Sequence, residues 1–205
     1  MPQRVGLVLA GGRGRRLGRP KGPIELEGRT LAARAAAALW PICGSVLVSV
    51  GSPGDDPAPD YPKVVDPPPP GRGPLVGIDA AFEASGDADL LVLACDYPFV
   101  TRDLLERLAA TPADAENLIM LTDSAGRDHP LVAIWRRDAA AVVRAAVAAE
   151  RLKVRALLAD LAVLRLAPAD LPGFDLDRAL LNVNEPEQLE RLLGDTPGAS
   201  DRWPS

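Results

Sequence analysis

Short, almost continuously apolar runs alternate along the chain with longer segments in which apolar residues recur at helical spacing. The main apolar runs cover residues 4–10, 45–50, 90–95, 117–122 and 131–135, and a late one covers 162–167. Strands that are covered on both faces have this composition, so we predict a buried strand in each run.

The segments with helical spacing lie between and after these runs. They cover residues 30–40, 77–86, 101–110, 137–152, 153–161 and 185–194. Thr101 is placed as an N-cap, with Asp103 in the first turn of its helix. The alternation of strands and helices predicts an α/β fold with three layers, Rossmann-like, around a mainly parallel central sheet.

Ligands of such sheets bind beyond the carboxyl ends of the strands. This rule places the loop after the first strand and the segments after Asp66 and Cys95 at one rim. We expect a single domain over residues 1–194, because a chain of this length can bury one sizeable core. The tail, residues 195–205, is predicted to be disordered.

Composition and charge exclude some classes of partner. Of the 205 residues, 47% are apolar and 25% charged, as in ordinary globular proteins. A net charge of −5 argues against a nucleic-acid partner. No apolar run is long enough for a signal peptide or a membrane span, so we expect no membrane partner. Cys43 and Cys95 read as reduced core thiols of a cytoplasmic protein.

Positive charge is concentrated instead in the first loop, LVLAGGRGRRLGRPKG, residues 7–22. Glycines at positions 11, 12 and 14 let backbone amides approach an anion closely. Five cations accompany them: Arg13, Arg15, Arg16, Arg19 and Lys21. The combination favours a phosphate-binding loop over a turn with solvated arginines.

Two common phosphate loops do not fit this spacing. A Walker A loop needs Ser or Thr after its lysine, but Lys21 is followed by Gly22. A dinucleotide fingerprint needs a third glycine where Leu17 stands, and Pro20 argues against a helix through this segment. The loop is therefore a long connection after a strand.

The segment from Leu9 to Leu31 resembles the signature of nucleotidyltransferases that move a nucleoside monophosphate from a nucleoside triphosphate. Its elements are Leu9 to Gly12, Arg16-Leu17-Gly18, Lys21, and the Leu-x-Gly-x-x-Leu step of residues 26–31. Later motifs resemble the molybdenum cofactor guanylyltransferases. These are GPLVGIDAA (73–81), CDYPFV (95–100), DHPLVAIW (128–135) and NVNEPEQL (182–189), so the resemblance spans residues 5–193.

The resemblance implies transfer of GMP from GTP to the terminal phosphate of molybdopterin, with release of pyrophosphate. Its implied catalytic residues are Lys21, Arg16 and Asp96. Its implied nucleotide-binding residues are Leu9, Ala10, Gly11, Gly12, Gly14, Lys21, Asp66, Gly73, Pro74 and Asp96. Its implied acceptor-binding residues are His129, Asn182 and Asn184. A molybdoenzyme or chaperone would then receive the product.

Asp96 follows an apolar strand, which places its carboxylate at the rim and facing the first loop. Mg²⁺ takes one or two carboxylates together with phosphate oxygens of the substrate, so Asp96 is the predicted metal ligand. The alternative is that Asp96 caps the helix that starts near Thr101, but five residues separate them.

The other candidates each keep an ordinary structural alternative. Asp66 is either an acidic residue near the nucleotide or the end of a strand in an Asp-Pro turn. Gly73-Pro74 either offers backbone contacts to a ligand or simply starts a helix. His129, the single histidine, lies just before a strand, and lines the acceptor pocket or belongs to an ordinary loop.

Asn182 and Asn184 flank one valine, so in an extended segment their amides point the same way. They suit recognition of the substrate or of the loop around Asp96, whereas turn-forming asparagines are the alternative.

Such a transfer needs no protein nucleophile, because the phosphate monoester of molybdopterin is itself the nucleophile. Loop amides and the cations Arg16 and Lys21 would stabilise the departing pyrophosphate. Base identity is open, since Gly51 and Ser52 stand where the family often carries an asparagine. The alternatives are a cytidylyltransferase, a sugar-phosphate nucleotidyltransferase, or a non-catalytic nucleotide-binding regulatory module.

Overall fold

A seven-stranded sheet forms the centre of the protein in the computed structural model, which describes residues 3–11, 22–26, 28–112 and 115–183. The strands in their spatial order are β5 (Lys63–Val65), β4 (Val46–Val50), β1 (Arg4–Leu9), β6 (Asp89–Ala94), β8 (Asp128–Trp135), β7 (Leu118–Thr122) and β9 (Val163–Leu166). Only the pairs that β8 makes with β6 and with β7 are antiparallel. The other pairs are parallel, which confirms the predicted mainly parallel sheet.

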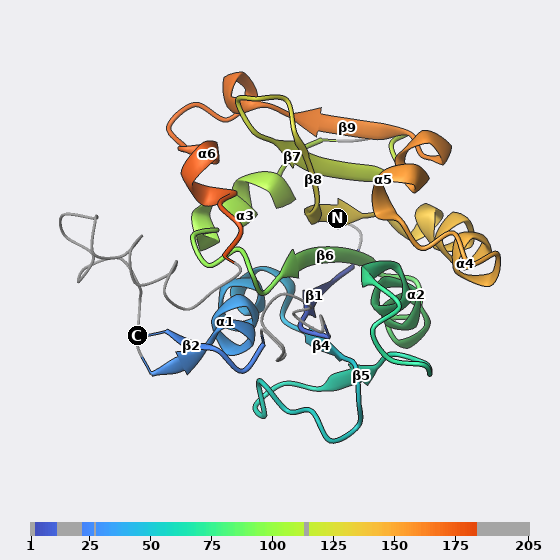
Figure 1. The fold of residues 1–205 in the computed structure, drawn as a ribbon. Helices are drawn as coiled ribbons and strands as arrows, with labels where there is room; N and C mark the ends of the chain where they lie inside the picture. The colour runs from blue at the N-terminus through green and yellow to red at the C-terminus, as the bar shows by residue number, and fades with distance from the viewer. Residues whose placement is uncertain (1–2, 12–21, 27, 113–114, 184–205) are drawn as a thin grey trace.

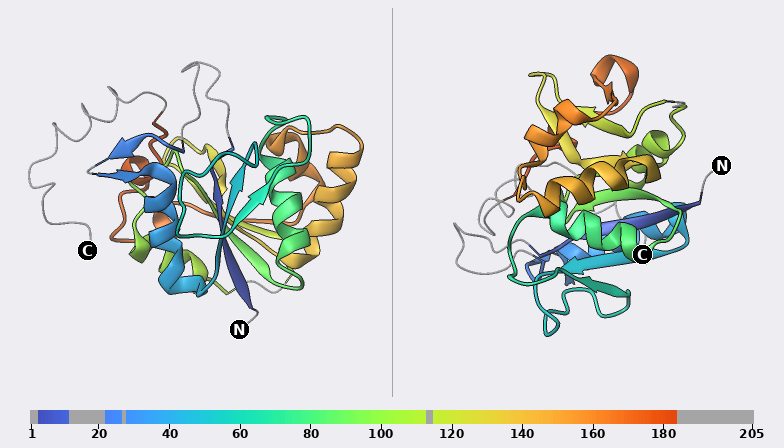
Figure 2. Two further views of the ribbon diagram at one scale, coloured as in Figure 1. Left: turned by 90° about the horizontal axis from the view of Figure 1, so that it is seen from below. Right: turned by 90° about the vertical axis from the view of Figure 1, so that its right-hand side faces the viewer.

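Helices cover both faces of this sheet and complete the predicted three layers (Figures 1 and 2). One face carries α1 (Leu31–Cys43), α3 (Arg102–Ala109) and the short α6 (Leu176–Ala179). The other carries α2 (Pro74–Ala84), α4 (Ala140–Ala148) and the short α5 (Val154–Leu157). A hairpin of β2 (Glu25–Leu26) and β3 (Arg29–Thr30) leads into α1. None of the described helices combines the length and apolar character needed to cross a bilayer.

Local sequence explains where the helices on the α1 face begin and end. Thr30 caps α1, its hydroxyl accepting from the Ala33 amide at 3.0 Å, and α1 ends at Gly44 with φ of 65°. The predicted cap at Thr101 is confirmed, because its hydroxyl accepts a hydrogen bond from the Leu104 amide at 3.3 Å.

Several predicted boundaries are corrected. The helix expected over 137–152 is a 3-10 turn, Arg137–Ala139, followed by α4, which ends at Ala148. The helix expected over 153–161 is α5 followed by a 3-10 turn, Leu158–Asp160. The strand β5 had been predicted only as the alternative in which Asp66 ends a strand, the helix α6 had not been predicted, and the helix expected over 185–194 lies outside the described residues.

β8 begins at Asp128, so His129 lies inside a strand and not just before one. Leu121 pairs with His129 and Met120 with Ala133, so residues 130–132 form an irregularity with no partner on β7. A proline fits there because no ladder donor is required of it. Pro130 instead accepts a 2.9 Å hydrogen bond from the indole of Trp135 through its carbonyl oxygen.

The order of the strands also creates a switch point at the centre of the sheet. From β1 the chain proceeds to β4 and β5 on one side, and then returns to β6 on the other side of β1. Open α/β sheets bind ligands at the carboxyl edge where the strand order reverses. The loop after β1 starts at this point, and Asp96 lies here just after β6.

Candidate functional site

Several predicted site residues lie at the carboxyl edge of the sheet. Their spatial order along this rim follows the order of the strands that carry them. Asp66 follows β5, Gly51 follows β4, Gly11 lies just beyond β1, Asp96 follows β6, and His129 is near the start of the antiparallel β8. Asp96 therefore lies between a half that contains Gly11 and Asp66 and a half that contains His129.

The first half begins where β1 ends. Leu9 is the last residue of β1, and the amide of Ala10 donates to the Ser49 carbonyl at 3.0 Å. A Cβ added at Gly11 would lie 3.1 Å from the Gly51 amide nitrogen and 3.2 Å from Oδ2 of Asp66. Glycine at position 11 therefore lets the backbone after β1 lie close against the ends of β4 and β5. Four predicted loop residues lie outside the described residues: Gly12, Gly14, Arg16 and Lys21.

Asp66 is buried, and the end of the neighbouring strand β4 holds it at the rim. Its carboxylate accepts a 2.8 Å hydrogen bond from the Ser49 hydroxyl, and its amide donates to the Val50 carbonyl at 2.9 Å. Burial raises the pKa of the Asp66 carboxyl, and the hydrogen bond from Ser49 opposes that rise. These contacts place Asp66 beside the start of the first loop. Asp66 also directly follows β5, as the alternative of a strand-ending aspartate predicted.

Sequence reasoning missed the residues that make room for this carboxylate. A Cβ at Gly77 of α2 would collide with the Ser49 hydroxyl and lie 3.2 Å from Oδ1 of Asp66. Ser49 is the one polar residue inside β4, and that break in an apolar strand was a readable signal.

Gly73 and Pro74 start α2, with Gly73 at φ of 121° and Pro74 in the first turn. Arg72, just before them, forms an ion pair with Glu150 in the segment after α4. The segment just before α2 is thus in contact with the later part of the chain.

Asp96 lies at the switch point, directly beyond β6. The amide of Cys95 donates to the Leu9 carbonyl at 3.2 Å, which ties this segment to the end of β1. Asp96 is half-buried, and its Oδ1 is buried. The side chain that caps α3 is Thr101, so capping by Asp96 is not what places it here.

The second half of the rim contains a hydrogen-bonded group that includes His129. Nδ1 of the buried His129 lies 3.3 Å from the Tyr97 hydroxyl, and Nε2 lies 3.4 Å from Oδ2 of Asp123. The side chain of Asn182 approaches the same hydroxyl, and burial raises the pKa of Tyr97 more than Asn182 lowers it. Sequence reasoning named His129 and Asn182 but missed Tyr97 and Asp123.

Asn182 reaches this group from a segment that is not a strand, contrary to the strand-like reading of its sequence. The amide of Val183 donates to the carbonyl oxygen of Asp96 at 2.8 Å, so the segment packs on the loop around Asp96. Asn184 lies outside the described residues.

Electrostatics keep His129 neutral and Asp123 ionised. Burial lowers the pKa of His129, and the nearby Asp123 only partly offsets this effect. Burial raises the pKa of Asp123, but hydrogen bonds from the backbone and guanidinium of Arg127 and from His129 outweigh it and lower the pKa to about 2. The Arg127 guanidinium lies 2.6 Å from Oδ2 of Asp123.

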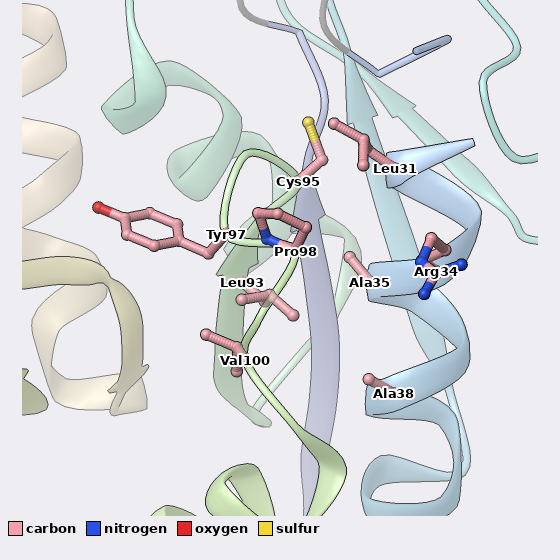
Figure 3. A pocket seen from close by; sticks show the side chains of 9 residues that line it. All are labelled: Leu31, Arg34, Ala35, Ala38, Leu93, Cys95, Tyr97, Pro98 and Val100. Carbon is pink, nitrogen blue, oxygen red and sulfur yellow. The ribbon is translucent and has the colours of Figure 1, made fainter. Parts of the chain in front are cut away.

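A small pocket lies beneath the rim between α1 and the segment after β6 (Figure 3). Its lining is mostly apolar: Leu31, Arg34, Ala35, Ala38, Leu93, Cys95, Tyr97, Pro98 and Val100. Asp66 and His129 are not part of this lining, and Tyr97 is the residue that the lining shares with the group around His129.

Asp96 is the residue at the switch point that fits a divalent cation. Within the ranges that the structure describes, no three His, Cys, Asp or Glu side chains come together to hold a metal ion. A site of one carboxylate still suits Mg²⁺, because substrate phosphates complete its oxygen ligands.

Comparison with known proteins identifies the family of this chain. The model of the MobA-like NTP transferase domain matches residues 6–169. The molybdenum cofactor guanylyltransferase of Rhodobacter capsulatus is 35% identical over 197 residues, which cover 91% of this chain and 93% of that protein. The probable molybdenum cofactor guanylyltransferase of Chloroflexus aggregans is 34% identical over 192 residues, covering 90% and 91%.

Solved structures share the fold. The molybdopterin-guanine dinucleotide biosynthesis protein A of Archaeoglobus fulgidus superposes with a TM-score of 0.72 at 24% identity, covering 91% of this chain and 95% of that one. The 2-C-methyl-D-erythritol 4-phosphate cytidylyltransferase of Thermus thermophilus gives 0.61 at 18% identity, covering 90% and 95%. The predicted nucleotidyltransferase fold is therefore confirmed, and the chain belongs to the family of MobA-like NTP transferase domains.

Proposed function

We propose that this protein transfers GMP from GTP to the terminal phosphate of molybdopterin and releases pyrophosphate. The observation that carries the proposal is the order of groups along the rim, with Asp96 between two differently built halves. Two substrates must meet in such a reaction, and a carboxylate at the switch point lies where they would meet. Family membership supports the same reaction class.

The nucleotide belongs to the half that contains Gly11 and Asp66. Backbone amides of the first loop approach its phosphates, and the chain can pass close to them because glycine stands at position 11. Arg16 and Lys21 supply the positive charge that stabilises the departing pyrophosphate. The start of α2 at Gly73 and Pro74 lies next to this half and offers backbone contacts.

The acceptor belongs to the half that contains His129 and Asn182, with Asn184 following in the chain. Its phosphate monoester attacks the α-phosphate of GTP, so the protein needs to align the two substrates and not to supply a nucleophile. Asp96 would hold Mg²⁺, which supplies charge neutralisation at the transferring phosphate when bound.

CTP is the second candidate nucleotide, and a feature of β4 favours considering it. Gly51 follows β4 where a base-reading side chain is often found, and it carries no such group. The product would pass to a molybdoenzyme or a chaperone. Free thiols at Cys43 and Cys95 support a reducing compartment, and we propose the cytoplasm.

Calorimetric titration of GTP and CTP in the presence of Mg²⁺, followed by a pyrophosphate-release assay with molybdopterin, tests the proposal. Asp96→Asn is the informative variant, and Asp87→Asn is its matched control, because Asp87 precedes the amino end of β6 and is fully exposed. We expect GTP to bind better than CTP, and we expect Asp96→Asn alone to weaken binding and to slow turnover by about 1,000-fold.

Preference for CTP would move the protein to a cytidylyltransferase with the same rim. Binding of neither nucleotide would refute the proposal. Nucleotide binding without pyrophosphate release would refute the transfer to molybdopterin and leave a sugar-phosphate nucleotidyltransferase or a regulatory module.

A further inference from the structure

Three distant segments meet at the Tyr97 hydroxyl, on the acceptor half of the rim. The hydroxyl lies 3.3 Å from Nδ1 of His129, which belongs to β8. The side chain of Asn182, from the segment after α6, approaches the hydroxyl as well and, against the larger effect of burial, lowers the pKa of Tyr97. Figure 3 shows the Tyr97 ring directed away from α1 and from the other residues that line the small pocket. The ring packs edge-on against the His129 imidazole with centroids 5.8 Å apart.

The direction of each hydrogen bond in this group follows from the charge of Asp123, which contacts the other side of the His129 ring. Asp123 is ionised and accepts hydrogen bonds only, so Nε2 of His129 must donate to it. A neutral imidazole has one donor, so Nδ1 is left as an acceptor. The Tyr97 hydroxyl therefore donates to Nδ1, which leaves its oxygen as the acceptor that faces the amide of Asn182.

Backbone hydrogen bonds of its own turn hold the Asp123 carboxylate in place, so it is a fixed acceptor for His129. Its Oδ1 accepts from the amides of Ala125 and Arg127 at 3.0 Å and 2.9 Å. The guanidinium of Arg127 compensates its charge at 2.6 Å, so His129 need not be protonated to satisfy it. The tautomer of His129 is thus set before any substrate binds.

We propose that Tyr97 is a positioning residue for the acceptor, whose hydroxyl fixes the His129 ring and holds the Asn182 segment against the loop that carries Asp96. The same segment makes a second contact, in which the Val183 amide donates to the Asp96 carbonyl at 2.8 Å. The two contacts are adjacent, because Val183 follows Asn182 and Asp96 precedes Tyr97. Loss of the hydroxyl loosens two acceptor groups at once. The kinetic part of this inference rests on the proposed function.

The consequence falls on one substrate only. Gly11 and Asp66 lie across β6 and β1 from Tyr97, so the nucleotide half keeps its contacts when the hydroxyl is removed. Tyr97 orients groups for an acceptor of phosphate-ester and polar-ring chemistry, and it does not itself enter the transfer.

Tyr97→Phe removes the hydroxyl and keeps the ring, and Tyr61→Phe is its matched control. Tyr61 is the other of the two tyrosines and packs against Trp40, away from the rim. We expect Tyr97→Phe to raise the KM for molybdopterin about 3- to 10-fold, the loss of one net hydrogen bond, with the KM for GTP unchanged. Combined with Asn182→Ala, it should cost no more than the larger single effect.

An unchanged acceptor KM, or equal changes in the KM for both substrates, would overturn the proposal. So would full additivity with Asn182→Ala, because the two groups would then act independently.

Nitrogen-15 NMR of His129 gives a reading that does not depend on activity, since this is the single histidine of the chain. We expect the Nε2–H tautomer in the wild type, a changed Nδ1 resonance in Tyr97→Phe, and no change in Tyr61→Phe. A proton on Nδ1 in the wild type, or an unchanged resonance in Tyr97→Phe, would refute the hydrogen-bond directions. If the wild type transfers nothing to molybdopterin, the proposed function fails, and the NMR result alone decides the role of Tyr97.

Discussion

Ser49 donates a 2.8 Å hydrogen bond to Asp66, joining the ends of β4 and β5 beneath α2. Both residues are buried, and Gly77 of α2 lies directly against them. A carboxylate is held ready at the rim because a helix passes over it without a side chain at that point. The stability and the function of the nucleotide half are therefore linked.

Gly77→Ala should break this arrangement. The added methyl group would collide with the Ser49 hydroxyl, so the helix or the Ser49–Asp66 pair must move. We expect a loss of about 1–3 kcal/mol in the free energy of unfolding, together with weaker GTP binding. Thermal unfolding and calorimetry measure the two effects. Gly54→Ala is the control, because a Cβ there meets no atom within 4 Å; equal losses in both variants would contradict the prediction.

Asp66→Asn should separate stability from binding. Since burial raises the pKa of Asp66 in the folded state, the native protein holds this proton more tightly than the unfolded chain does. The contribution of Asp66 to stability is therefore present at low pH and is lost as the pH rises through the raised folded pKa. At pH 7 we expect Asp66→Asn to be more stable than the wild type in urea and to bind GTP less well.

The wild type should lose stability relative to this variant as the pH rises above about 4, the ordinary range of a carboxyl group. A constant difference between the two proteins from pH 3 to pH 7 would show that the charge of Asp66 costs nothing.

Asp123→Asn should show the opposite dependence on pH. The folded pKa of Asp123 is lowered to about 2, so its stabilising effect is full above the unfolded pKa and is lost as the pH falls towards 2. An asparagine would present a donor to Arg127 and His129, and we expect it to cost about 1–3 kcal/mol at pH 7.

Urea unfolding of Asp123→Asn between pH 2 and pH 7 measures this effect. The difference from the wild type should shrink as the pH falls from about 4 to about 2. Asp87→Asn, on an exposed side chain, should show no such change. A pH-independent loss in Asp123→Asn would mean that only the shape of the turn matters.

Lys21→Ala should reduce turnover by about 100- to 1,000-fold while leaving the thermal unfolding temperature unchanged, because the lysine is predicted to serve the phosphates and not the core. Pyrophosphate release and thermal unfolding check the two parts. Lys63→Ala, at the exposed start of β5, is the matched control. Loss of folding in Lys21→Ala would show that the lysine is structural.

The sequence was sufficient to predict the strands that define the switch point. β1 and β6 are continuous apolar runs, so their ends, and with them Gly11 and Asp96, could be placed in advance. β5 was offered only as an alternative, because a strand of Lys63–Val65 among prolines is too short to show a period. The start of β8 escaped prediction because Pro130 reads as a loop residue until the irregularity beside β7 is seen.

The contacts that build the two halves of the rim follow from no spacing rule. Ser49 and Asp66 are 17 residues apart, and Tyr97 and His129 are 32 apart. Such pairs are brought together by the order of the strands, which hydrophobic periodicity does not determine. The site residues were therefore easier to predict from the sequence than the residues that they contact.

The strand order also bears on how such a protein changes over time. In the proposal, the nucleotide contacts other than Asp96 come from chain segments up to α2, whereas the acceptor contacts come from segments after β6, and the two sets meet in the sheet at the neighbouring strands β1 and β6. Mutations in the later segment can alter the choice of acceptor while the earlier segment conserves the donor. The sheet thus combines a constant nucleotide-binding part with an acceptor-binding part that can vary between relatives.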